Sequence, residues 1–376
     1  MTNFFLFNSL GALLLLTFLA IFNVKNVNKK GNAWFGVFCF TVFLILVEEE
    51  LIFLKVETKF FSEVFNLAAF TVAPIFYLSI IYFVSPNRKW KFKDNFHFSF
   101  SIFYLVLIIG NHFFSNTKKE INQNENSIGQ IISILFLILF ALQLISYAFL
   151  SYIKVITHQK NIKNFSSNIE NIDLQWLKYI IISVAILSSF WAIEILSNTD
   201  NNGNHFIKIM VFVIVYTIAF FMLKQQEIYP FKTEDKDNII ALSDETATSD
   251  SSVEKKKLIS DEKFNEIKEQ LLAHMKNERP YLESELSLIK LSRSLNTTTH
   301  ILSYVINSGF DESFYQFINK YRIEEAKKLI TDPKMNHLSI LGIGFEVGFN
   351  SKSVFNTVFK NNTGLTPTEF KKTTLK

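Results

Sequence analysis

The first 224 residues alternate between long apolar runs and short polar loops. A transmembrane helix needs about 20 apolar residues to cross a hydrocarbon core about 30 Å thick. Seven runs reach that length, and the expected spans are Phe4–Val24, Ala33–Phe53, Phe65–Val84, Phe96–Phe114, Ile128–Ile153, Leu174–Leu196 and Phe206–Leu223. Soluble domains rarely repeat such runs, so we predict a seven-helix transmembrane bundle over residues 1–224.

The loops between these runs differ in positive charge. The loops after the first, third and fifth runs hold Lys25, Lys29, Lys30, Arg88, Lys89, Lys91, Lys93, Lys154, Lys160 and Lys163. The alternate loops hold fewer lysines, and the last of them holds none. Because cytoplasmic loops are enriched in Lys and Arg, we expect the N-terminus outside the inner (cytoplasmic) membrane and the C-terminus in the cytoplasm. The first run is not expected to be a signal peptide, because its positive charges follow it.

An acidic region separates the apolar half from the rest. Residues 225–262 hold 5 Lys or Arg against 10 Asp or Glu, and residues 225–261 are predicted to be a flexible linker. From Asp261 to Lys276 the pattern becomes amphipathic, with one face formed by Phe264, Ile267, Leu271 and Met275. This helix is expected either to cover the following domain or to pair with a second copy, which would make the working form a homodimer.

Residues 322–370 contain three short apolar faces with helical spacing. Their members are Ile323, Ala326, Leu329 and Ile330, then Ile340, Ile343 and Val347, then Val354, Phe355, Val358 and Phe359. Between the second and third faces, Gly348 can adopt the positive φ that ends a helix, and Ser351 can cap the next helix. Two short helices around a tight turn form a helix-turn-helix, whose second helix can enter the DNA major groove.

The same stretch resembles the core of the AraC/XylS family of transcription regulators. The matching residues are Arg322, Ile323, Ala326, Leu329, Val347, Gly348, Phe349, Phe355, Phe359, Lys360, Gly364, Thr366, Pro367 and Phe370. The resemblance implies an all-α DNA-binding domain with two helix-turn-helix motifs over residues 262–376, with a core at 280–373. Gly344 stands where the family usually has alanine. With Gly342 it puts two glycines in one short helix, so we expect that helix to be less stable than is usual.

The family resemblance also places a first motif upstream of Arg322. Leu288, Leu291 and Leu295 form one apolar face, and Thr297, Thr298 and Thr299 offer N-caps for the next helix. Phe314 to Ile330 would be the long helix that separates the two motifs. By matching the family pattern, the positions that face the DNA groove are His300, Ser303, Tyr304, Lys352, Ser353 and Thr357.

The chemistry of these six positions suits moderate base discrimination. Lys352 can donate to guanine O6 and N7, whereas serine, threonine and histidine can donate or accept. Arginine is missing from the six positions, and residues 280–376 are only mildly basic, with 12 Lys or Arg against 9 Asp or Glu. Arg322 and Lys360 are expected to support phosphate contacts or the fold.

Carboxylates near the outer ends of two spans are the main candidates for sensing. Glu48, Glu49 and Glu50 lie in the second span, and Glu194 lies in the sixth. Carboxylates inside a membrane are costly and often functional, although they can also reach the outer interface. Three adjacent helical residues point about 100° apart, so at most two of the three glutamates can face one site.

The remaining chemistry favours a regulator over an enzyme. Metal-ligand spacings, phosphate-binding loops and catalytic constellations are missing from the sequence, so we expect no cofactor, no metal and no enzymatic activity. We predict a membrane-bound one-component transcription regulator that binds promoter or operator DNA and responds to a small-molecule or envelope signal. Activation, the family's usual mode, would add RNA polymerase as a partner. One alternative is a transporter-like protein whose cytoplasmic domain reports substrate occupancy. Another is a degenerate DNA-binding domain that binds a partner protein.

Overall fold

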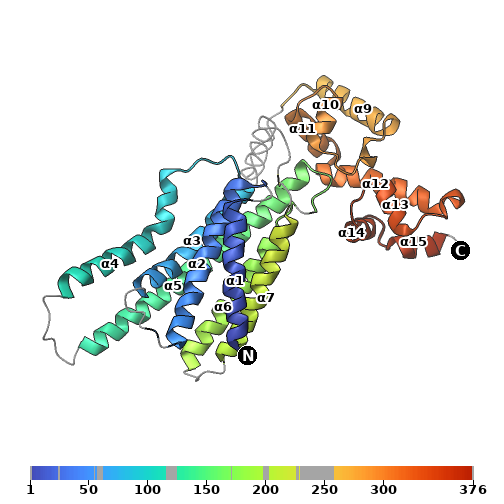
Figure 1. The fold of residues 1–376 in the computed structure, drawn as a ribbon. Coiled ribbons are helices and arrows are strands. Elements are labelled where there is room, and N and C mark those ends of the chain that lie inside the picture. Colours follow the sequence, from blue (N-terminus) through green and yellow to red (C-terminus); the bar gives the residue numbers. More distant parts are fainter. Residues whose placement is uncertain are drawn as a thin grey trace. The chain divides into compact units, whose positions relative to one another are not determined.

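The computed structural model describes residues 2–23, 26–54, 56, 62–115, 125–170, 172–197, 203–225, 228 and 258–374. The described residues form helices and no strand, which confirms the all-α expectation. The chain divides into two compact units, residues 1–156 with 174–228, and residues 157–173 with 229–376 (Figure 1). The second unit therefore includes the segment between the fifth and sixth long helices, which the sequence did not indicate.

The first unit is built from seven long helices that follow the apolar runs. They are α1 (Thr2–Ile21), α2 (Lys29–Phe53), α3 (Ser62–Val84), α4 (Ser99–Ser115), α5 (Glu125–Asn161), α6 (Gln175–Ser197) and α7 (Gly203–Lys224), and a short 3-10 helix η1 (Phe92–Phe98) precedes α4. α1 packs against α2 and α7, α3 packs against α2, and α6 packs against α7 (Figure 1). α5 contacts α3 through Gln143, whose side-chain amide donates to the Phe70 carbonyl at 3.0 Å.

Six helices among the described residues are long and apolar enough to cross a membrane. They cover Phe4–Ile21, Lys29–Glu48, Glu63–Val84, Phe92–Gly110, Ile138–Asn164 and Phe206–Lys224. α6 contributes only the shorter apolar stretch Gln175–Leu187. Large apolar side chains such as Phe4, Ile145 and Phe149 are more than 60% exposed on the outside of the bundle. The apolar half is therefore compatible with membrane insertion, and the count of seven spans stays a prediction.

The second unit is a group of short helices whose starts are set by hydroxyl caps. They are α9 (Asp261–Asn277), η3 (Pro280–Leu282), α10 (Leu288–Ser294), α11 (Thr299–Phe310), α12 (Phe314–Thr331), η4 (Pro333–Met335), α13 (Ile340–Glu346), α14 (Lys352–Thr363) and α15 (Pro367–Thr374). The short helix η2 (Ile162–Asn164), which follows α5 in the chain, belongs to the same unit. A serine or threonine accepts a hydrogen bond from the backbone three residues later at Ser260, Ser287, Thr298, Ser313, Ser339 and Ser351. Each cap satisfies one backbone donor that the first helical turn leaves free.

Helix α9 covers the domain that follows it. Ile267, Leu271 and Met275 are at most 2% exposed, and the Phe264 ring packs edge-on against Tyr304 of α11 at 5.7 Å between centroids. The apolar face is therefore used within the chain, and it no longer supports a coiled coil or the homodimer based on it. Of the linker at 225–261, only Gln225, Ile228 and residues 258–261 belong to the described residues.

Candidate nucleic-acid interface

The second helix pair, α13–α14, is joined by the turn that the sequence indicated. Gly348 has φ +94°, and a Cβ there would lie 2.8 Å from the carbonyl oxygens of Tyr281 and Leu282. Both the backbone conformation and the lack of space require glycine. Ser351 then accepts a hydrogen bond from the Val354 amide at 3.3 Å, which starts α14.

Helix α14 has one buried and one exposed face. Phe355, Val358 and Phe359 belong to the hydrophobic cluster with Ile323, Ala326, Ile330, Ile343, Val347 and Phe349. Lys352, Ser353 and Thr357 are all exposed. The second helix pair thus presents a polar face that includes all three residues that the sequence placed toward DNA.

The first helix pair, α10–α11, buries more of its corresponding face. Leu302, Val305 and Ile306 of α11 are fully buried, as their spacing predicts. Ser303 is only 8% exposed, and its Oγ accepts a hydrogen bond from Asn307 Nδ2 at 3.4 Å. His300 is half-buried, and Tyr304 lies against Phe264. These three positions therefore do not form an open polar face like that of α14.

Arg322 of α12 lies between the two helix pairs and is 1% exposed. Its Nε donates to the Tyr281 carbonyl at 2.7 Å, and its Nη2 donates to the Glu283 carbonyl at 2.7 Å. The guanidinium also lies 5.6 Å from the centroid of the Phe349 ring. Burial lowers the pKa of Arg322 to about 10, so the group stays protonated at neutral pH. This geometry gives Arg322 a role in the fold and leaves no surface for a phosphate contact.

The other residues of the family pattern also support the fold. Ala326, Phe355 and Phe359 are fully buried, and Gly364 ends α14 with φ +79°. Pro367 begins α15, where the Thr366 amide donates to Glu369 Oε2 at 2.8 Å. In the described part of this region the motif residues therefore stabilise the fold, whereas the residues of the polar face of α14 have no such role.

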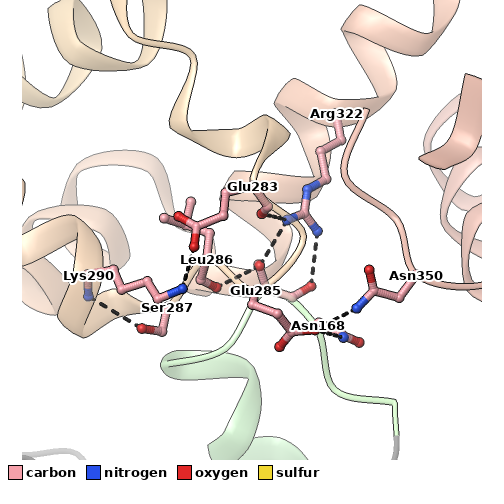
Figure 2. A network of polar contacts seen from close by, with 9 residues as sticks. Asn168, Glu283, Glu285, Leu286, Ser287, Lys290, Arg322 and Asn350 are labelled. Atoms are coloured by element: carbon pink, nitrogen blue, oxygen red, sulfur yellow. Dashed lines mark hydrogen bonds and ion pairs between the residues drawn. The ribbon is translucent and has the colours of Figure 1, made fainter. Parts of the chain in front are cut away.

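Two polar residues at this junction were missed by the sequence analysis. Asn350, directly before the cap of α14, donates from Nδ2 to Glu285 Oε1 at 2.6 Å (Figure 2). Glu285 lies just before α10, so the contact ties the start of one helix pair to the turn of the other. Single polar residues in turns have no periodic pattern, and nothing in the sequence could have paired them.

The sensor candidates are only partly described. Glu50 is 4% exposed, and neither of its carboxylate oxygens has a hydrogen-bond partner among the described residues. Glu48 is half-buried, and the side chains of Glu49 and Glu194 lie outside the described part. The described residues contain no group of three or more His, Cys, Asp or Glu that could hold a metal ion.

Comparisons with known proteins concern the C-terminal part. Residues 291–373 match the protein family described as "Helix-turn-helix domain". A curated protein of Pseudoalteromonas carrageenovora, an uncharacterized HTH-type transcriptional regulator in the cgkA 5' region, is 43% identical over 56 residues. That alignment covers 15% of this chain and 31% of the relative, so the chain spans less than a third of its length. No solved structure matches the chain. The C-terminal part is thus similar to a helix-turn-helix domain, and the matches support DNA binding in transcription regulation.

Proposed function

We propose that the protein is a transcription regulator held in the cytoplasmic membrane by its N-terminal helices. The exposed polar face of α14, on a part of the chain that matches the helix-turn-helix domain, carries this proposal. The six long apolar helices in the same chain supply the membrane part. The C-terminal domain binds double-stranded DNA, and the membrane helices respond to a small-molecule or envelope signal.

The fold of the second unit supports the proposed topology. Residues 157–173 pack in the same unit as the DNA-binding helices, so both lie on one side of the membrane. The lysine pattern places the same loop in the cytoplasm. Between this loop and residue 229 the described residues form α6 and α7, so the two helices must either both cross the membrane or both stay on one side. This argument favours seven spans, with the N-terminus outside and the C-terminus inside.

The two helix pairs would act as two helix-turn-helix motifs of unequal exposure. Lys352 is suited to guanine, and Ser353 and Thr357 can donate or accept at base edges. On the first pair His300 and Tyr304 are half-buried, and Ser303 is buried. We therefore assign most of the base recognition to α14.

The buried Glu50 supports a sensing role for the first unit. A buried carboxylate without a hydrogen-bond partner among the described residues costs free energy, and a bound cation or polar ligand would reduce that cost. Glu50→Gln keeps the shape of the side chain but removes its charge. We expect this variant to change the target-gene response while leaving protein level unchanged, and an unchanged response would contradict a role for Glu50.

Chromatin immunoprecipitation of the full-length chain tests the proposed function. The wild-type chain should enrich discrete promoter fragments and should remain in the membrane fraction after alkaline extraction. The control is the triple variant Lys352→Ala, Ser353→Ala, Thr357→Ala, which should lose the enrichment at equal protein level. Recovery of the wild-type chain in the soluble fraction, or equal enrichment by both proteins, would contradict the proposal.

A further inference from the structure

The connection between α5 and α6 forms a backbone pairing with the start of the first helix pair. Ser166 and Ser287 form an antiparallel bridge. The Ser167 amide donates to the Leu286 carbonyl at 3.2 Å, and the Leu288 amide donates to the Phe165 carbonyl at 2.9 Å. The Ser167 hydroxyl adds a third bond, to the Leu286 carbonyl at 2.7 Å. These contacts join segments that are about 120 residues apart in the sequence.

The same connection reaches Arg322 and the turn before α14. Arg322 Nη2 donates to Ser167 Oγ at 3.0 Å, and Nη1 lies 3.4 Å from the Ser167 carbonyl. Asn168 Nδ2 donates to Glu285 Oε1 at 3.0 Å, the oxygen that also accepts from Asn350 (Figure 2). One short loop therefore contacts the residues that link the two helix pairs.

The loop is anchored as well as hydrogen-bonded. Ile162, Phe165 and Ser167 are at most 3% exposed. Asn161 ends α5 and Gln175 begins α6, so a relative shift of these two helices must act on the residues between them. Yet Lys352, Ser353 and Thr357 stay exposed while the loop is in place.

We propose that residues 162–168 form a docking element through which the membrane helices control the arrangement of the two helix pairs. The inference rests on the proposed function. When the loop is docked, the two helix pairs are held in one relative orientation by Glu285, Arg322 and Asn350. In this state Lys352, Ser353 and Thr357 are exposed and Asn350, directly before α14, is held by Glu285, so we take the docked state as the DNA-binding arrangement. Release of the loop weakens DNA binding.

A disulfide across the bridge tests the contact in the intact chain. Ser166 and Ser287 form a non-hydrogen-bonded antiparallel pair, whose Cα atoms lie about 4.5 Å apart, within the range that a disulfide spans. The natural cysteine, Cys39, is buried. Ser166→Cys with Ser287→Cys should cross-link rapidly in oxidised membrane vesicles. The control pair, Lys163→Cys with Ser287→Cys, starts from an exposed side chain and should react slowly. Equal reaction of both pairs would overturn the docking.

DNA affinity of the full chain in lipid nanodiscs tests the consequence, with a promoter fragment recovered by immunoprecipitation as the probe. Asn168→Ala and Ser167→Ala each remove loop hydrogen bonds and should weaken binding about three- to tenfold. Lys160→Ala, at an exposed position outside the docking element, should bind like the wild type. The oxidised cysteine pair should restore affinity in the Asn168→Ala background. Unchanged affinity in both loop variants, or weaker binding by the cross-linked chain, would overturn the proposal. If the proposed function itself fails, the wild-type chain binds no specific DNA although the cross-link still forms.

Discussion

The two helix pairs of the second unit have similar cores but different surfaces. In both pairs a hydroxyl cap starts the second helix, and apolar residues with helical spacing are buried. On α14 the three expected DNA-facing residues are exposed, whereas on α11 Ser303 is buried and Tyr304 contacts α9. A helix-turn-helix pattern therefore specifies which residues of each pair are buried in its core, while neighbouring elements determine which helix face remains exposed.

Arg322→Met should give the largest effect, because this residue serves both helix pairs. Its loss leaves the carbonyls of Tyr281 and Glu283 without their buried donor. We expect the free energy of unfolding to fall by about 3–5 kcal/mol, because at least two hydrogen bonds from a charged donor, each worth about 1.5–3 kcal/mol, are lost together. Hydrogen exchange of the full chain should show lost protection in α10 and α14 together.

The matched control is Lys320→Met, on the same helix but exposed in an ion pair with Glu312. Surface pairs contribute about 0–1 kcal/mol, so protection should barely change. Loss of protection confined to one helix pair in Arg322→Met would show that the two pairs are stabilised separately.

Lys352→Ala tests whether Lys352 of α14 contacts a base or a phosphate. If Lys352 contacts a base, affinity for the recovered promoter should fall by about 1–3 kcal/mol while non-specific binding stays the same. Fluorescence anisotropy of the full chain in nanodiscs measures both, with Lys276→Ala on α9 as the control. A uniform loss on all sequences, with a salt slope lower by about 1, would place Lys352 on a phosphate instead.

Two glycines of α13 allow a matched test of the second pair's packing. A Cβ at Gly344 would lie 2.8 Å from the Phe355 ring, whereas a Cβ at Gly342 would have its nearest neighbour at 3.4 Å. Gly344→Ala should therefore destabilise the second pair by about 1–2 kcal/mol through overpacking, and Gly342→Ala should stabilise it by about 0.5–1 kcal/mol. Hydrogen exchange in α13 and α14 gives both values. Stabilisation by both substitutions would show that the Phe355 ring leaves enough space for a Cβ at position 344.

The smallest expected effect is the pH dependence of the contact between Arg279 and Glu325. Burial raises the pKa of Glu325, but the hydrogen bonds from Arg279 and Lys328 outweigh burial, so the pKa lies below its usual value. The carboxylate thus contributes stability above the unfolded pKa of about 4.3, and this contribution is lost as the pH falls through the folded pKa. Glu325→Gln should flatten the decline of α12 protection between pH 6 and pH 3. An unchanged decline would show that other carboxylates cause it.

Much of this architecture could be predicted from local patterns. The apolar faces of α12 and α14, the cap at Ser351 and the glycine turn at Gly348 all follow from spacing and backbone conformation. The docking of Ser167 on Leu286 could not be predicted, since it joins distant polar loops without any periodic signal. The burial of Ser303 likewise depends on the packing around α11 and not on its own sequence. The seventh span and the sensing carboxylates remain predictions.

DNA binding by the full chain in nanodiscs shows which helix pair recognises the bases, when one triple alanine variant is made on each pair. The α14 triple replaces Lys352, Ser353 and Thr357, and the α11 triple replaces His300, Ser303 and Tyr304. We expect the α14 triple to lose specific binding to the recovered promoter, whereas the α11 triple, with its folding confirmed by hydrogen exchange, should keep most of it. Specific binding that survives in the α14 triple and is lost in a folded α11 triple would contradict the assignment of base recognition to α14.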